Sequence, residues 1–300
     1  TEGLRIEDCA TARAKKVGLQ VDNSNIEINR KFYSLRNYDQ DSRGTEDDAG
    51  ILANNSNIKF LQEGVSTDAF DSQIVVSQQM RGVHLVNSKI MGGLKSNASL
   101  SNGSLLGALS CETGFELDNS VIDLDGVLDT FACQSTGLKA TGSTIRIDSS
   151  VFQGNASKGM DLKNSTCEYN KNLTNITSYP TMGATIPNYL HQQTFSYNGQ
   201  HVVCDESKFY HKYGVSIPQK SGSSCYYVST GASKVDAGTV IRNKPSIELN
   251  KSEADFVHAN IFANLTGSES VRGCNIAANN QSTARLKKKK KNASCAILNG

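Results

Sequence analysis

The chain has 300 residues, 37% of them apolar, and its 31 basic and 29 acidic side chains give a net charge of +2. Such a small net charge creates no dominant electrostatic field, so we expect no nucleic-acid partner. The sequence has no run of 18 or more apolar residues, which excludes a membrane-spanning helix. A chain of this length can nevertheless bury a sizeable hydrophobic core.

From residue 18 onward, one nine-residue phrase recurs. It consists of a glycine, two apolar residues at alternate positions, and an Asn-Ser pair followed two residues later by another apolar residue. The first four copies begin 32 residues apart and two looser copies follow after 23 and 22 residues, at Gly18, Gly50, Gly82, Gly114, Gly137 and Gly159. Repetition with a period of roughly 20 to 50 residues is typical of a solenoid, whose units bury their apolar faces by stacking.

Each copy predicts a strand that ends in a corner. In the fourth copy, Phe115 and Leu117 alternate with Glu116 and Asp118, as expected of a half-buried strand. Asn tolerates the left-handed backbone region and therefore suits a corner, and the leading glycine is expected to release the chain from the preceding loop. Strand, corner, strand and loop make one coil of a parallel β-helix. Six residues are predicted to form one interior column: Leu19, Ile51, Val83, Phe115, Leu138 and Met160.

The spacing of the copies separates the coils from their insertions. A spacing of 22 or 23 residues corresponds to one coil, so a spacing of 32 residues is one coil with about ten further residues in its loop. The extra segments, residues 36–46 and 94–104, are polar and predicted to be loops. Leucine-rich and ankyrin repeats are disfavoured because the helical pattern that they need between copies is missing.

The recurring phrase resembles the right-handed parallel β-helix, the pectin-lyase-like superfold, over about residues 15–170. That group includes polysaccharide lyases and hydrolases, phage tailspikes, bacterial adhesin passengers and the β-helical parts of some type III secretion effectors. The resemblance implies an all-β, right-handed parallel β-helix solenoid but no particular activity. We expect an N-terminal cap over residues 1–17 and regular coils over residues 18–170. Residues 171–300 are expected to form an irregular continuation with long loops and a C-terminal cap.

The eight cysteines are scattered and form no Cys-x-x-Cys pair, so no zinc or redox motif and no cofactor is predicted. Cys111 and Cys133 are 22 residues apart, about one coil, and could stack on neighbouring coils. The favoured interpretation is that the cysteines are small buried apolar side chains. Disulfide pairing in an oxidising compartment is the alternative.

The second half of the chain departs from the regular phrase. Eight of the ten tyrosines lie between Tyr169 and Tyr227. Residues 252–265 fit either a helix or two strands joined by a bend, and we favour the strands. A basic run, Arg285 with residues 287–291, is typical of a solvated strip, and anionic lipid, glycan or nucleic acid is the alternative contact.

One group of charged residues is a candidate catalytic or calcium site. Asp123 and Asp125 are expected to project outward, with Arg146 and Asp148 at the matching positions one coil later. Adjacent carboxylates beside an arginine can bind calcium or perform acid–base chemistry on an acidic sugar polymer. Alternating charge on a solvated sheet face gives the same pattern, and this second interpretation is favoured. The Asn-Thr-Asp, paired Asp and Gly-His-Gly set expected of the similar glycoside hydrolases is missing, and the chain has no tryptophan.

A second group lies in the tyrosine-rich segment. Histidine, cysteine and aspartate gather there, at His191, His201, Cys204, Asp205 and His211. Their spacing fits no metal-ligand motif, so no metal site is predicted. Exposed tyrosines provide contact area at low entropic cost. We therefore predict a binding surface formed by Tyr197, His201, Tyr210, His211 and Tyr213.

These observations favour a non-catalytic recognition or scaffold rod of an exported bacterial or phage protein. Its expected partner is a host surface, a glycan or a host protein, and its expected location is secreted or delivered to a host. A polysaccharide lyase or glycoside hydrolase of the β-helix type is the first alternative. It requires a groove in which two carboxylates and a basic residue converge with shifted pKa values. The second alternative is a β-helical fragment of a larger secreted effector.

Overall fold

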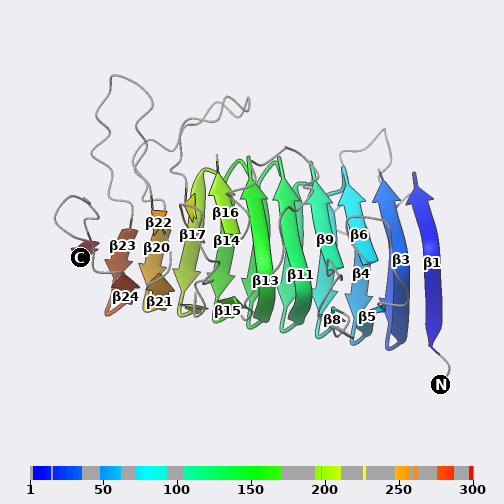
Figure 1. Ribbon diagram of the computed structural model, residues 1–300, viewed down its shortest axis with the longest axis horizontal. Coiled ribbons are helices and arrows are strands. Elements are labelled where there is room, and N and C mark those ends of the chain that lie inside the picture. The colour runs from blue at the N-terminus through cyan, green and yellow to red at the C-terminus, as the bar shows by residue number, and fades with distance from the viewer. Residues whose placement is uncertain are drawn as a thin grey trace, which may run out of the picture.

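The computed structural model describes the following residues: 3–14, 16–35, 48–61, 72–92, 104–169, 193–196, 198–210, 226–227, 247–256, 260–261, 276–286 and 297–299. Within these ranges all regular secondary structure is β, with 25 strands in two parallel sheets and no helix. The strands stack side by side along one axis, from β1 at one end of the molecule to β23 and β24 near the other (Figure 1). The described part therefore contains no helix that is long and apolar enough to cross a membrane.

The first six strands of the smaller sheet, which we call sheet B, carry the recurring phrase, and four strands that lack it follow. Neighbours in this sheet come from successive coils, so each coil contributes one strand. Its ten strands are β2 (Val17–Asp22), β4 (Ala49–Asn54), β7 (Arg81–Val86), β10 (Thr113–Asp118), β12 (Thr136–Thr141), β14 (Lys158–Lys163), β17 (Gln200–Asp205), β20 (Ile247–Asn250), β23 (Ile276–Asn279) and β25 (Ile297–Asn299).

The larger sheet, sheet A, contains β1 and nine strands that each follow a corner ending in serine. They are β1 (Leu4–Ala12), β3 (Asn25–Leu35), β5 (Asn57–Leu61), β8 (Lys89–Met91), β11 (Val121–Phe131), β13 (Thr144–Gln153), β15 (Thr166–Tyr169), β18 (Lys208–Tyr210), β21 (Glu253–Phe256) and β24 (Thr283–Leu286). The distal halves of β3, β11 and β13 belong to a third row, in which they pair with further strands. The further strands of the third row are β6 (Ser72–Ser77), β9 (Ser104–Leu109), β16 (Gln193–Ser196), β19 (Tyr226–Tyr227) and β22 (Asn260–Ile261).

The predicted interior column is confirmed by the register of sheet B. The pairing places Leu19 beside Ile51, and the same row runs on through Val83, Phe115, Leu138 and Met160. It continues beyond the regular copies through three further residues, Val202, Ile247 and Ile276. From Ile51 onward every member is completely buried. Because parallel strands stack in register, one apolar position repeated per coil becomes one continuous core row.

The predicted corner is also confirmed. Asn23, Asn55, Asn87, Asn119 and Asn164 all have φ between 47° and 49°, the left-handed region that Asn tolerates. In the fifth coil Gly142 takes this place, with φ 60°.

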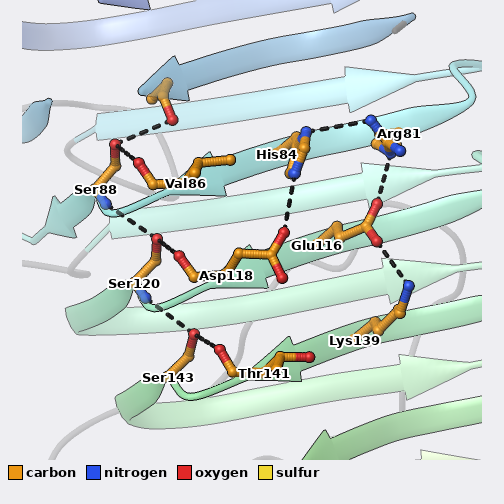
Figure 2. A network of polar contacts seen from close by, with 11 residues as sticks. Arg81, His84, Val86, Ser88, Glu116, Asp118, Ser120, Lys139, Thr141 and Ser143 are labelled. Carbon is orange, nitrogen blue, oxygen red and sulfur yellow. Dashed lines mark hydrogen bonds and ion pairs between the residues drawn. The ribbon is translucent and has the colours of Figure 1, made fainter. Parts of the chain in front are cut away.

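The serine after each of these residues builds a hydrogen-bond ladder along the molecule. The Ser56 N–H donates to Ser88 Oγ at 3.0 Å. The Ser88 N–H donates to Ser120 Oγ at the same distance (Figure 2). Each Oγ from Ser24 to Ser252 also donates to the carbonyl two residues earlier, as Ser120 does to Asp118 at 2.7 Å, whereas Ser282 donates to Asn279, three residues earlier. The whole ladder joins nine coils: Ser24, Ser56, Ser88, Ser120, Ser143, Ser165, Ser207, Ser252 and Ser282.

We expect Ser120→Ala to lower the free energy of unfolding by about 1–3 kcal/mol, because it leaves the buried Ser88 N–H without its acceptor. Ser24→Ala is the matched control. Ser24 is exposed, and within the described residues its Oγ accepts no N–H, so we expect a change below about 0.5 kcal/mol. Urea denaturation followed by circular dichroism measures both variants. Equal effects of the two substitutions would contradict a stabilising role for the ladder.

The role predicted for the glycines is wrong. Gly137 is buried inside β12, and its backbone is not in the left-handed region. A Cβ there would lie 2.6 Å from Thr130 Oγ1 and 2.7 Å from the Gly159 carbonyl oxygen. The glycine is therefore required because the third row of strands packs closely against sheet B, and not because it releases the chain from a loop.

Several predictions concern segments that are described only in part. The strands favoured for residues 252–265 are confirmed over Glu253–Phe256 and Asn260–Ile261. The two predicted loops lie outside the described residues, except that Ser104 belongs to β9. Residues 1–17, predicted to form a cap, contain β1, which pairs in parallel with β3 as a further strand of sheet A.

Candidate functional site

The structure brings together two of the four predicted catalytic residues. Asp123 on β11 and Arg146 on β13 are direct partners in sheet A, and Arg146 Nη1 lies 3.7 Å from Asp123 Oδ2. Arg146 Nε also lies 3.6 Å from Glu168 Oε2 on β15. Arg146 therefore joins carboxylates from the coil before and the coil after its own. Glu168 was missed by the sequence reasoning, although it follows Arg146 by 22 residues, the length of one coil.

The other two predicted residues, Asp125 and Asp148, are not simple register partners as expected. The register shifts between Leu124 and Val127, so two residues of β11 stand opposite the single Asp148 of β13. This bulge takes Asp125 out of the simple row that Asp123 and Arg146 share. The side chains of Asp125 and Asp148 lie outside the described part of the structure.

Opposite charges also pair elsewhere in the outward row of sheet A to which Asp123 and Arg146 belong, although Met91 and Tyr210 interrupt the row. Lys59 lies 3.9 Å from Glu27 near one end, and Arg285 lies 3.7 Å from Asp255 near the other. Such exposed pairs each contribute no more than about 1 kcal/mol. These pairs match the interpretation of this face as a solvated sheet surface on which opposite charges neutralise each other.

A denser polar cluster lies on the outward face of sheet B, and the sequence did not single it out. It consists of Arg81 and His84 on β7, Glu116 and Asp118 on β10, and Lys139 on β12 (Figure 2). His84, Glu116 and Lys139 occupy one row of the register. Their separations of 32 and 23 residues repeat the spacing of the copies, so this period was the available signal.

Glu116 is the centre of this cluster. Its Oε2 lies 2.5 Å from Arg81 Nε and its Oε1 lies 2.8 Å from Lys139 Nζ. His84 Nδ1 lies 3.3 Å from Arg81 Nη1, and His84 Nε2 lies 3.3 Å from Asp118 Oδ2. Because arginine can only donate, Nδ1 accepts, and the imidazole proton is placed on Nε2, which donates to Asp118.

The electrostatics of the cluster keep Glu116 ionised. The carboxylate side chain is only 13% exposed, and burial alone would raise its pKa. The hydrogen bond from Lys139 and the charge of Arg81 outweigh that cost, so the pKa of Glu116 is lowered. The hydrogen bond to Glu116 in turn raises the pKa of Lys139. The cluster is therefore an ion-paired link between three coils at neutral pH.

Replacing Glu116 with glutamine is expected to lower the free energy of unfolding by about 1–2 kcal/mol at pH 7, because Arg81 and Lys139 lose their shared carboxylate. A group whose pKa is lower in the folded than in the unfolded state contributes stability at pH values above its unfolded pKa. This contribution is lost as the pH falls through the folded pKa. The difference in free energy of unfolding between the variant and the wild type should thus be constant above about pH 5 and should disappear at acid pH. Glu206→Gln, which breaks an exposed pair with Lys251, is the control, with an effect below about 1 kcal/mol. A Glu116→Gln deficit that persists at acid pH would contradict the assignment.

The structure does not support His201 as a surface contact. His201 is completely buried in β17, where the register sets it beside Gly159 of β14. Burial lowers its pKa to about 3, so the imidazole is neutral, and its Nδ1 lies 3.3 Å from Asn198 Nδ2. The alternation of β17 also directs Cys204 inward, and Asp205 outward into a hydrogen bond from Asn250.

Tyr210 is the one predicted binding residue that is both described and partly exposed. Its hydroxyl donates to Glu253 Oε2 at 2.9 Å, linking β18 to β21. Burial, together with this bond to Glu253, raises the pKa of Tyr210 to about 12. Four residues of the two predicted clusters lie outside the described residues: His191, Tyr197, His211 and Tyr213.

The interpretation of the cysteines as buried apolar side chains is confirmed for four of the five that the structure describes. Cys111, Cys133, Cys167 and Cys204 are free thiols with no more than 1% exposure, and Cys9 is free and partly buried. Burial raises the pKa of Cys111 to about 12 and that of Cys133 in the same direction. Among the described residues, no three or more His, Cys, Asp or Glu side chains gather in a way that could hold a metal ion.

The fold defines an all-β protein with two parallel sheets and one strand of sheet B per coil, which is the arrangement of a β-solenoid. Comparison with known proteins finds no matching family model, no similar curated protein and no similar solved structure.

Proposed function

We propose that the chain is a right-handed parallel β-helix of the pectin-lyase-like kind and acts as a non-catalytic recognition or scaffold rod. The observation that carries the proposal is the use of outward charges as links between coils. Glu116 is held between Arg81 and Lys139, and Arg146 is held between Asp123 and Glu168. These side chains fasten the stack together along its length.

The charge state of Glu116 supports a structural role over acid catalysis. Glycoside hydrolysis needs a carboxylic acid whose pKa is raised, so that it carries a proton at neutral pH. The pKa of Glu116 moves in the opposite direction. A stack fastened by ion pairs and the serine ladder is a rigid support, and solenoids use such supports to present extended binding surfaces.

The partner we propose is a glycan or a host protein, and the setting is a bacterial or phage protein exported or delivered to a host. Both follow from the resemblance of the repeat to adhesins, tailspikes and β-helical effectors, and both stay predictions. One binding experiment distinguishes recognition of such a partner from enzymatic turnover.

A panel of immobilised acidic and neutral polysaccharides, with host-cell surface protein as a further arm, tests the proposal. We expect capture of the protein by at least one surface with no release of reducing or unsaturated sugar ends over hours. Sugar release would overturn the proposal in favour of an enzyme. Absence of capture on every surface would overturn the recognition role.

One observation favours the polysaccharide lyase or hydrolase as the second candidate. Two carboxylates and one cation do converge, because Asp123 and Glu168 both lie within 3.7 Å of Arg146. If the panel releases sugar, the paired variants Asp123→Asn and Glu168→Gln decide whether this group is responsible. Loss of release in both, with unchanged thermal unfolding, would assign the chemistry to it.

A further inference from the structure

One coil carries a histidine where the coils before it carry glycine. The register of sheet B sets His201 directly after a row of glycines: Gly50, Gly82, Gly114, Gly137 and Gly159. This row faces the interior, and His201 is completely buried. A titratable ring therefore lies inside the stack, at the contact between β14 and β17, where the earlier coils have no side chain.

Asn198, which comes just before β17, links these two coils. Its Oδ1 accepts hydrogen bonds from the Asn155 N–H at 3.0 Å and from Asn155 Nδ2 at 2.8 Å. Its Nδ2 donates to the Phe152 carbonyl at 2.9 Å. Asn155 and Phe152 both precede β14, so this one amide joins the β17 coil to the coil before it. Asn155 and Asn198 are no more than 1% exposed, and water therefore does not compete for these bonds.

His201 completes the hydrogen bonding of this amide. Asn198 Nδ2 lies 3.3 Å from His201 Nδ1. The Oδ1 end of Asn198 accepts from Asn155, so Nδ2 is the donor and His201 Nδ1 is the acceptor, without a proton. A proton on Nδ1 would place two donors against each other. The link between the coils therefore requires the neutral imidazole.

The neighbouring strands bring no charge to the ring. The rings of His201 and Phe195 have centroids 6.2 Å apart, and β16, to which Phe195 belongs, contains no titratable residue. Lys158 and Asp161 of β14 are partly exposed and pair with each other at 2.5 Å, and Lys163 is exposed. These charges are directed to solvent or to one another.

The strand that carries His201 brings no charge to it either. Cys204 is a buried thiol whose pKa is raised by burial, so it stays neutral. Asp205 points outward and accepts a hydrogen bond from Asn250. Burial is thus what lowers the pKa of His201, to about 3. When the ring is exposed to water, its pKa returns to about 6.5.

We propose that His201 makes the contact between the β14 and β17 coils open in mild acid. Below about pH 6.5 an exposed ring takes up a proton, whereas the closed cluster keeps the ring neutral. Because the pKa of His201 is lower in the closed than in the open state, the closed state is fully favoured above about pH 6.5. This preference is lost as the pH falls toward about 3. The device controls the cohesion of the rod and so goes beyond the proposed recognition role.

Two buried thiols of the full chain report the opening. Cys204 lies on β17 itself, and Cys111 lies in an earlier coil, before β10. The reagent is 4,4′-dithiodipyridine, which reacts with exposed thiols also in weak acid, and peptide mass spectrometry measures the labelling rate at each cysteine. We expect the ratio of the Cys204 rate to the Cys111 rate to rise about 30-fold from pH 7.5 to pH 5. This range lies above the pKa of ordinary carboxylates.

Two variants assign the effect to one histidine. His201→Gln removes the titratable ring, so we expect the ratio to stay constant over the same pH range. His84→Gln is the matched control, because His84 lies on the outward face of sheet B, and it should keep the 30-fold rise. The proposal is overturned by a constant ratio in the wild type, by a rise that persists in His201→Gln, or by loss of the rise in His84→Gln.

A titration of the wild type keeps the test decisive if His201→Gln does not fold. The ring resonances of His201 in the folded protein, followed by NMR, should not move between pH 7.5 and pH 5. A titration of His201 with a midpoint near pH 6.5 would show that the closed cluster accepts the proton, and it would overturn the proposal.

Discussion

Replacing Gly137 with valine is expected to lower the free energy of unfolding by about 4 kcal/mol or more. A Cβ at this position would lie 2.6 Å from Thr130 Oγ1, 2.7 Å from the Gly159 carbonyl oxygen and 2.8 Å from Phe152 Cδ1. Overpacking a well-packed core costs about 1–3 kcal/mol when side chains can adjust. Here one neighbour is backbone and the other two are completely buried, so the strain has no route of relief.

Denaturation by guanidinium chloride, followed by circular dichroism, measures this loss. Thr141→Val is the matched control, because Thr141 lies on the same strand, β12, and points outward. It introduces a branched side chain of nearly the same volume, and we expect a change within about 0.5 kcal/mol. If Gly137→Val unfolded at the same denaturant concentration as the wild type, the close approach of the third row to sheet B would be refuted.

The glycines illustrate why part of the fold could not be predicted from the sequence. The recurring phrase covers sheet B, the corner and the start of sheet A, and each of these repeats once per coil. The third row lacks such a phrase: β6 and β9 begin with Ser72 and Ser104 after insertions, and β11 passes through a bulge. The need for glycine at position 137 comes from contacts with that row. The alternation of inward and outward residues along β12 could therefore not reveal it.

The repeat predicted contacts between side chains that lie one coil apart in the register. Asp123 and Arg146 meet because 23 residues separate them, and Glu168 could have been added by the same arithmetic. The contact between Arg81 and Glu116 was harder to predict, since it runs diagonally between rows and depends on how a long side chain bends.

His201 shows the opposite failure. A histidine among tyrosines suggested a binding surface by residue type alone. Its position in β17 places it beside Gly159, in the row that glycines occupy in the earlier coils, and this row faces the interior. Position within the repeat therefore decides burial, and the residue type decides only what the interior must accommodate.

Phe115→Ala tests the interior column itself, and we expect it to lower the free energy of unfolding by about 3–5 kcal/mol. Phe115 is completely buried, and the register sets it between Val83 of the preceding coil and Leu138 of the following one. The stacked strands cannot collapse around the missing ring without shifting the serine and glycine rows, so a cavity remains.

Leu19→Ala is the internal comparison for this prediction, because Leu19 belongs to the same column but lies at its partly exposed end. Within sheet B only β4 pairs with its strand among the described residues, so its loss should cost about 1–2 kcal/mol. Stability in a stack of coils is approximately a sum of nearest-neighbour contacts, so the cost of truncation should rise from the end toward the middle. Equal losses at Leu19 and Phe115, measured by urea denaturation, would show that the column is not the continuous core described above.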